Sequence, residues 1–87
     1  MGKKIRINID VLAAVSDTSQ KFVVRLDGLA GATPKEMFNN AVSRGRMAEA
    51  TGKMGGNRTN WELFKLKDAG RLSDTTFRLG DDVVKID

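Results

Sequence analysis

Cysteine, histidine and tyrosine are all absent from this 87-residue sequence. Without cysteine the chain has no disulfide and no thiol nucleophile, and without cysteine or histidine the usual zinc sites are excluded. No apolar run approaches the length of a membrane span, and no apolar region follows the basic N-terminus as it would in a leader. We therefore expect a soluble protein without cofactor or metal, and a cytoplasmic location is the default expectation.

The length is enough for one domain, residues 1–87, with a single modest core. Such a domain has little room for a deep catalytic cleft. Catalysis without histidine or cysteine would need a carboxylate pair, a lysine or a metal, and the adjacent acids Asp81 and Asp82 are typical of a turn. We therefore predict that the protein is not an enzyme.

Positive charge is in excess, with 15 Lys and Arg against 11 Asp and Glu and a formal net charge of +4. An excess of this sign is compatible with nucleic-acid binding. The basic residues are interleaved with acids, however, and a base-stacking surface would need several exposed aromatic rings. The chain has one Trp and four Phe, which a small core needs. A small basic nucleic-acid-binding protein is therefore one alternative function, with a solvated basic face as the competing explanation.

Two stretches near the N-terminus have the pattern of half-buried strands. Residues 5–9 alternate isoleucine with polar residues, and residues 11–12 extend the stretch. Residues 21–26 have one apolar face, and the polar residues 13–20 before them favour turns. Two successive strands joined by a polar loop predict an antiparallel hairpin.

A helix is predicted after this hairpin. Thr33 can cap its N-terminus, Pro34 suits the first helical position, and Glu36 stands where a capping-box partner belongs. Apolar residues between 37 and 48 recur at spacings of three and four, which predicts a stripe that packs on a sheet. Residues 51–52 end the helix.

The C-terminal third is predicted to hold a loop and two strands. Residues 51–60 contain three glycines without a phosphate-binding pattern, which favours a long connecting loop. Residues 61–66 alternate apolar and polar side chains and predict a third strand, ended by turn residues 67–70. Residues 83–86 are rich in β-branched side chains and predict the last strand.

The segment from residue 68 to residue 86 resembles the C-terminal half of ubiquitin-like proteins. The resemblance lies in an Asp-x-Gly turn, the run GRLSD at residues 70–74, a Gly-Asp turn and a final β-branched strand. It implies an α+β fold, the ubiquitin-like β-grasp, in which a β-β-α-β-β mixed sheet carries one helix and the last strand runs parallel beside the first. In particular, the chain resembles bacterial ubiquitin-like proteins that lack a C-terminal Gly-Gly tail.

The resemblance implies a noncovalent interaction module that binds a protein partner through its exposed sheet face, as a monomer or weak oligomer. The residues expected on that face are Arg6, Asn8, Lys65, Lys67 and Lys85, with Trp61 or Phe64 as an apolar anchor. For the charged residues a plain solvated strand face is the competing explanation, and for Trp61 it is burial in the core. The other alternative is a modifier for conjugation whose Gly-Gly tail lies beyond the final residues VVKID.

Overall fold

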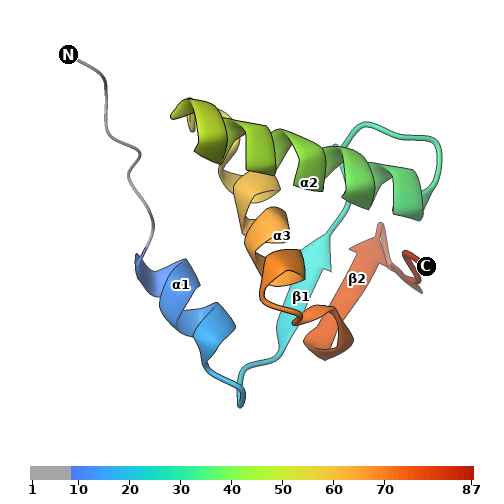
Figure 1. Cartoon of the computed structure of the whole chain (residues 1–87). Coiled ribbons are helices and arrows are strands. Elements are labelled where there is room, and N and C mark those ends of the chain that lie inside the picture. Colours follow the sequence, from blue (N-terminus) through green and yellow to red (C-terminus); the bar gives the residue numbers. More distant parts are fainter. Residues whose placement is uncertain (1–8) are drawn as a thin grey trace.

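The structure, a computed structural model, describes residues 9–87, with side chains from Val11 onward. Over this range the chain forms a small α+β domain, which confirms the α+β part of the predicted fold class (Figure 1). Its elements are α1 (Ile9–Ser16), β1 (Phe22–Arg25), α2 (Pro34–Thr51), α3 (Arg58–Asp68), the 3-10 helix η1 (Leu72–Asp74), β2 (Thr75–Leu79) and β3 (Asp82–Val84).

The three strands form one mixed sheet in the order β1-β2-β3. β1 runs parallel to β2, with Val24 opposite Phe77, and β2 runs antiparallel to β3, with Phe77 opposite Val84. A tight turn joins β2 to β3 at Gly80, whose φ of 62° is a conformation that glycine adopts without a steric penalty. The parallel pair therefore joins two segments that are separated in the sequence by both long helices.

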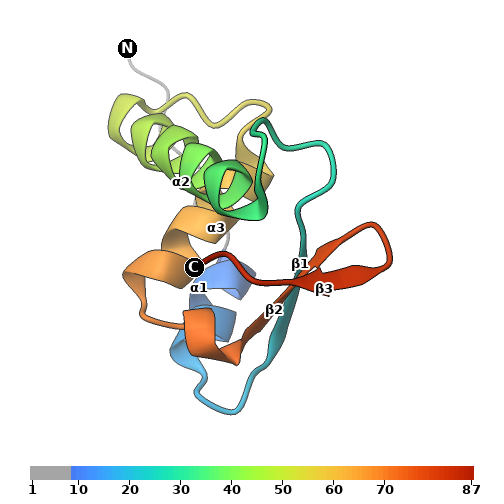
Figure 2. The ribbon, with the colours of Figure 1, turned by 90° about the vertical axis from the view of Figure 1, so that its right-hand side faces the viewer.

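Helices cover one face of the sheet, and no described element covers the other face. Figure 2 views the sheet from its edge, with α1, α2 and α3 all on the same side of it. Phe22, Val24 and Phe77 point toward these helices and belong to the core or pack against it. On the opposite side, Val23 is 68% exposed and Val83 is 66% exposed. The sheet thus has one face buried by helices and one face open to solvent.

Helix α2 confirms the prediction made from local signals. The side chain of Thr33 accepts a hydrogen bond from the Glu36 N–H at 3.1 Å, and Pro34 lies in the first turn. At the other end Gly52 has a left-handed conformation and donates its N–H to the Ala48 carbonyl. Both ends are therefore stabilised by residues within a few positions of the terminus.

The segment predicted as the third strand is helix α3, so that prediction is wrong. Trp61, Leu63, Phe64 and Leu66 are all buried. They form two pairs spaced by three residues, Trp61 with Phe64 and Leu63 with Leu66. With 3.6 residues per turn the two pairs lie on different sides of the helix, so α3 is buried on two sides. A strand would have turned the neighbours Leu63 and Phe64 to opposite faces. The helical spacing prevails because it buries all four side chains in one core.

Further corrections concern the neighbouring segments. Residues 11–12, predicted to extend a strand, lie in α1, and the long loop ends at Asn57, just before α3 begins. The last strand is shorter than predicted and pairs antiparallel with β2. The predicted strand 5–9 lies outside the described residues except for Ile9, which begins α1. The described elements therefore differ from the β-β-α-β-β order, although the predicted second strand is confirmed as β1.

Helices α2 and α3 approach each other closely at a glycine. A Cβ atom on Gly45 would lie 2.2 Å from the Asn60 carbonyl oxygen and 2.7 Å from the Trp61 Cα. Trp61 is fully buried, and its indole N–H donates to the Glu49 carboxylate of α2 at 3.1 Å. The close crossing of the two helices therefore depends on the absence of a side chain at Gly45, and the large side chain of Trp61 is buried beside it.

Candidate binding surface

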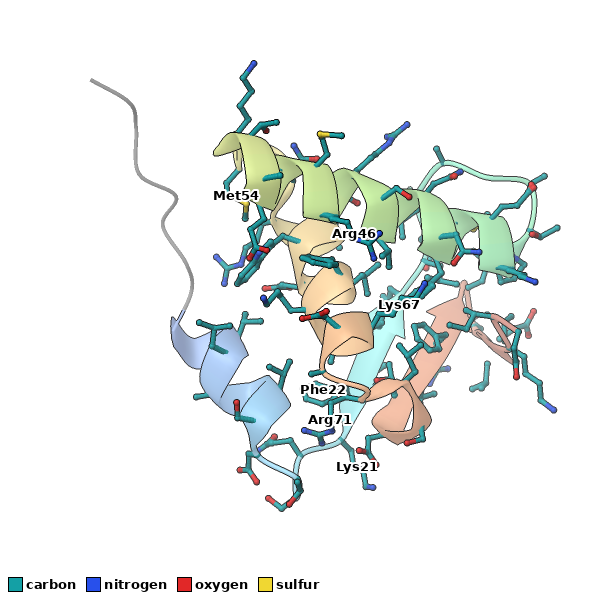
Figure 3. All side chains as sticks on the ribbon, viewed as in Figure 1. Lys21, Phe22, Arg46, Met54, Lys67 and Arg71 are labelled. Carbon is teal, nitrogen blue, oxygen red and sulfur yellow. The ribbon has the colours of Figure 1, made fainter. Side chains whose placement is uncertain are left out.

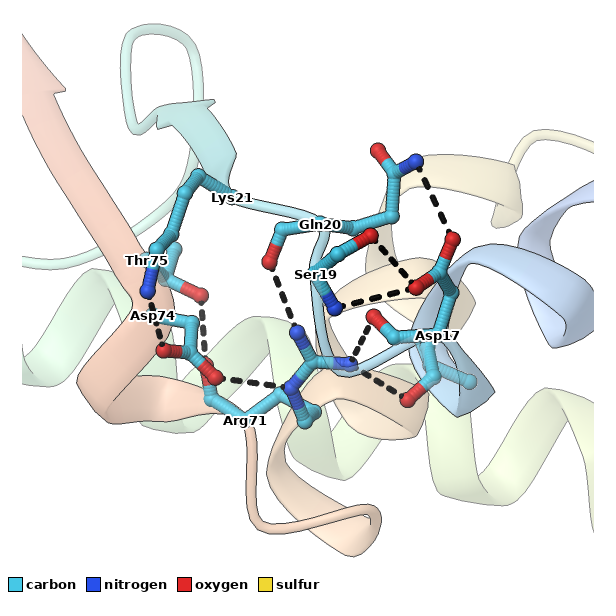
Figure 4. A network of polar contacts seen from close by, with 8 residues as sticks. Asp17, Ser19, Gln20, Lys21, Arg71, Asp74 and Thr75 are labelled. Carbon is cyan, nitrogen blue, oxygen red and sulfur yellow. Dashed lines mark hydrogen bonds and ion pairs between the residues drawn. The ribbon is translucent and has the colours of Figure 1, made fainter.

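A buried arginine holds the α1–β1 connection against η1 (Figure 4). Arg71 is 6% exposed, and its Nη1 donates to the carbonyl oxygens of Val15 at 2.7 Å and Asp17 at 3.0 Å. Its Nη2 donates to the Gln20 carbonyl at 2.7 Å, and its Nε donates to the Asp74 carboxylate at 2.9 Å. A guanidinium paired this fully by its own chain stabilises the fold and leaves little capacity for a ligand.

Two carboxylates of the same network have pKa values below the ordinary range. Hydrogen bonds from the side chain and backbone of Ser19 lower the pKa of Asp17. The hydrogen bond from the Lys21 ammonium, at 2.8 Å, lowers the pKa of Asp74, and Arg71 adds to the effect. Both groups therefore remain ionised at neutral pH and act as structural acceptors.

The predicted apolar anchors of the sheet face are not on the sheet. Trp61 is 0% exposed and Phe64 is 8% exposed, and both belong to α3. Lys65 also lies on α3, where its ammonium is 3.5 Å from the Glu49 carboxylate. The placement of these three residues on the exposed sheet face is wrong because it depended on a strand at residues 61–66, which is part of α3.

The remaining predicted residues are scattered. Lys67 is exposed in the last turn of α3 (Figure 3), so it too lies away from the sheet face. Lys85 is exposed and follows β3. Arg6 and Asn8 lie outside the described residues. The structure therefore does not bring the predicted binding residues together.

The uncovered side of the sheet carries a different set of residues, here called the open face. Its members are Val23 and Arg25 of β1, Thr76 and Arg78 of β2, and Val83 of β3. The register places them together, because Val23 lies opposite Thr76 and Arg78 lies opposite both Arg25 and Val83. Val23 and Arg25 alternate with the half-buried residues of β1, a signal that is visible in the sequence. The contribution of β2 was missed because β2 was not predicted.

Two guanidinium groups of the open face meet at the β2–β3 turn. Arg25 Nη1 is 3.4 Å from the Gly80 carbonyl oxygen, and Arg78 Nη2 is 3.1 Å from the Asp81 carbonyl oxygen. Asp27 is 3.6 Å from Arg25, and its other oxygen accepts the Gly80 N–H at 2.8 Å. The Nε of Arg78 is buried without a hydrogen-bond partner. Contacts within the chain therefore use only some of the hydrogen-bond donors of these two guanidinium groups.

A groove of about 600 Å³ runs beside β1, between α1 and α3. Its lining is largely apolar, and includes Val11, Val15, Val24, Leu63 and Leu66. An exposed ion pair of Arg58 with Glu62, at 2.8 Å, also lines it. The groove is continuous with the open face, because Val23 and Arg25 belong to both.

Comparisons of this chain with protein-family models, with curated proteins and with solved structures give no match. In residues 9–87, acidic side chains do not gather into a group of three or more that could hold a metal ion. No helix in that part of the chain has the length and apolar character needed to cross a membrane. Among the described residues, the open face and the adjoining groove together combine exposed apolar side chains, two arginines and a hollow.

Proposed function

We propose that the protein is a noncovalent protein-interaction module that binds a partner protein through the open face. The observation that carries the proposal is the exposure of Val23 and Val83, at 68% and 66%, on a sheet face that no described helix covers. Removal of apolar surface from water, as when a partner covers it, is favourable by about 25 cal/mol of free energy per Å². Exposed apolar side chains that gather on one face among polar residues are typical of interaction sites.

The dimensions of the open face favour a transient complex. Three strands spaced by about 4.8 Å, with residues spaced by about 3.3 Å, span roughly 10 by 15 Å. A stable interface buries about 800 Å² on each partner, which is several times more. The groove beside β1 enlarges the surface on one side. We therefore expect a partner that associates and dissociates readily.

The ubiquitin-like resemblance supports the proposal as an analogy, because the family's exposed sheet face is the expected binding surface. A β-grasp fold remains a hypothesis for this chain. Helix α3 occupies the segment where that fold would have its third strand. The main support for the proposal is therefore the open face, and the resemblance is secondary.

The test is capture of a partner from a lysate of the source cells by the immobilised full chain. Val23→Asp and Val83→Asp each place a charge on the open face. Met47→Asp is the matched control, because Met47 is 62% exposed but lies on α2. We expect one discrete protein to be retained by the wild type and by the control, and lost by both valine variants.

Amide NMR spectra of the three variants should first show that each remains folded. A partner retained equally by all four proteins would contradict the proposal, as would equal loss from the control and the valine variants. Retention of nucleic acid in place of a protein would favour the basic nucleic-acid-binding alternative.

A further inference from the structure

We infer that the partner of the open face presents a carboxylate that bridges Arg25 and Arg78, with apolar side chains beside it. This inference rests on the proposed function and adds the chemistry of the partner. Arg25 and Arg78 lie opposite each other in the register of β1 and β2. Their guanidinium groups bind consecutive carbonyl oxygens, those of Gly80 and Asp81. Two cations are therefore held close together on a face that is open to solvent.

This arrangement is unfavourable without an anion, because like charges opposite each other in a sheet destabilise it. Among the described residues, Asp27 is the carboxylate within ion-pair distance of the two, and it contacts only Arg25. The carboxylates of Asp81 and Asp82 are exposed and form no ion pair with either arginine. Each guanidinium therefore keeps donors that the chain does not use.

A carboxylate matches those donors, because its two oxygens accept hydrogen bonds from guanidinium groups in a bidentate geometry. The neighbours of the arginine pair favour a carboxylate on a protein. Val23 and Val83 flank the pair and offer apolar contact to side chains. A nucleic acid carries a charge every few ångströms, whereas the arginine pair is a single cationic spot with valines beside it. A second copy of this chain would bring further arginines against the pair.

The experiment compares two synthetic peptides in titrations of the full chain. One peptide alternates valine with glutamate, and the other alternates valine with glutamine. The side-chain Nε–H signals of Arg25 and Arg78 in NMR spectra report directly on the guanidinium groups. We expect the glutamate peptide to bind about tenfold more tightly, since hydrogen bonds between ionised groups are about twice as strong as neutral ones. Both arginine signals should shift only with that peptide.

Three variants test the assignment. Arg25→Gln and Arg78→Gln should each weaken binding of the glutamate peptide about tenfold and leave the glutamine peptide unaffected. Arg25 is 64% exposed, so its replacement leaves the fold intact even where loss of Arg78 loosens the turn. Arg46→Gln removes the same charge from α2, where Arg46 lies over the Phe64 ring, and should change nothing.

Equal affinity for the two peptides overturns the inference, as does an equal effect of Arg46→Gln. So does binding of DNA or inorganic phosphate in preference to the glutamate peptide. Failure of this inference is distinct from failure of the proposed function. If the valine variants lose the captured partner but both open-face arginine variants retain it, the proposed interaction module is supported and the inferred carboxylate contact is contradicted. If all of these variants still bind the partner, the proposed function itself is contradicted.

Discussion

Replacing Gly45 by alanine should destabilise the domain, although alanine is the better helix former. The added Cβ would lie 2.2 Å from the carbonyl oxygen of Asn60 and 2.5 Å from its carbonyl carbon. Both atoms belong to the backbone of α3, so no change of rotamer relieves the overlap. The two helices must move apart, and the packing around the fully buried Trp61 is lost with that movement.

The size of the effect follows from two opposing contributions. Alanine gains about 1 kcal/mol over glycine in helix propensity. Overpacking costs about 1–3 kcal/mol, and contact with rigid backbone puts this case at the upper end, at about 3 kcal/mol. The expected loss in the free energy of unfolding is therefore about 2 kcal/mol, or a fall in Tm of about 8–16 °C for a domain of this size. Urea unfolding followed by the fluorescence of Trp61, the single tryptophan, measures it.

Gly55→Ala provides the matched control for this measurement. No atom lies within 4 Å of a Cβ built on Gly55, and its φ is not positive. The control should match the wild type or exceed its stability by about 0.4–1 kcal/mol, because alanine restricts the unfolded chain. If Gly45→Ala is as stable as this control, the close approach of α2 to α3 at Gly45 is refuted.

Three other predictions concern polar contacts within the fold. Arg71→Met should lower the free energy of unfolding by about 3 kcal/mol in urea titrations, because it removes four hydrogen bonds that a buried guanidinium donates to three carbonyl oxygens and the Asp74 carboxylate; a neutral result would contradict the role of the network. The lowered pKa values of Asp17 and Asp74 mean that the unfolded chain binds more protons just below the ordinary pKa of 3.8. The stability that these carboxylates contribute is therefore present above that pH and is lost as the pH falls through the folded values, and unfolding curves of Asp74→Asn should depend less on pH there than those of the wild type. Glu49→Leu should cost about 1–3 kcal/mol by leaving the Trp61 indole N–H unpaired, whereas Glu49→Gln, which keeps an acceptor, should cost less in the same assay.

The elements that the sequence predicts correctly are those with local causes. The ends of α2 are set by Thr33 and Gly52, which act on backbone groups a few residues away. The alternation in β1 likewise reports which of its side chains are buried. Helix α3 has no comparable signal at its start, because Asn57 makes no side-chain cap to the helix. Its buried side chains pack in a core formed by residues distant in the sequence, and its backbone lies against Gly45 of α2.

The candidate site was less accessible to sequence reasoning than the fold class. Val23 and Arg25 stand on the polar side of a correctly predicted strand. Arg78 and Val83 join them only through the register of β2 with its two neighbours. That register depends on a parallel pairing between distant segments, which no local pattern encodes. The presence of an exposed sheet face was therefore predictable, but its composition was not.

The parallel pairing of β1 with β2 also determines an order of events during synthesis. Ribosomes add about 5–20 residues each second, so β1 waits about 3–10 s for its partner strand, which follows some fifty residues later. Helices form and pack in far less time, so α2 and α3 can associate while β1 still lacks its partner strand β2. During that interval the run Phe22–Arg25 is able to pair with any other strand that it meets. The nascent chain is therefore most vulnerable to misassociation before residue 79 emerges, and β1 is the segment that a chaperone would need to shield.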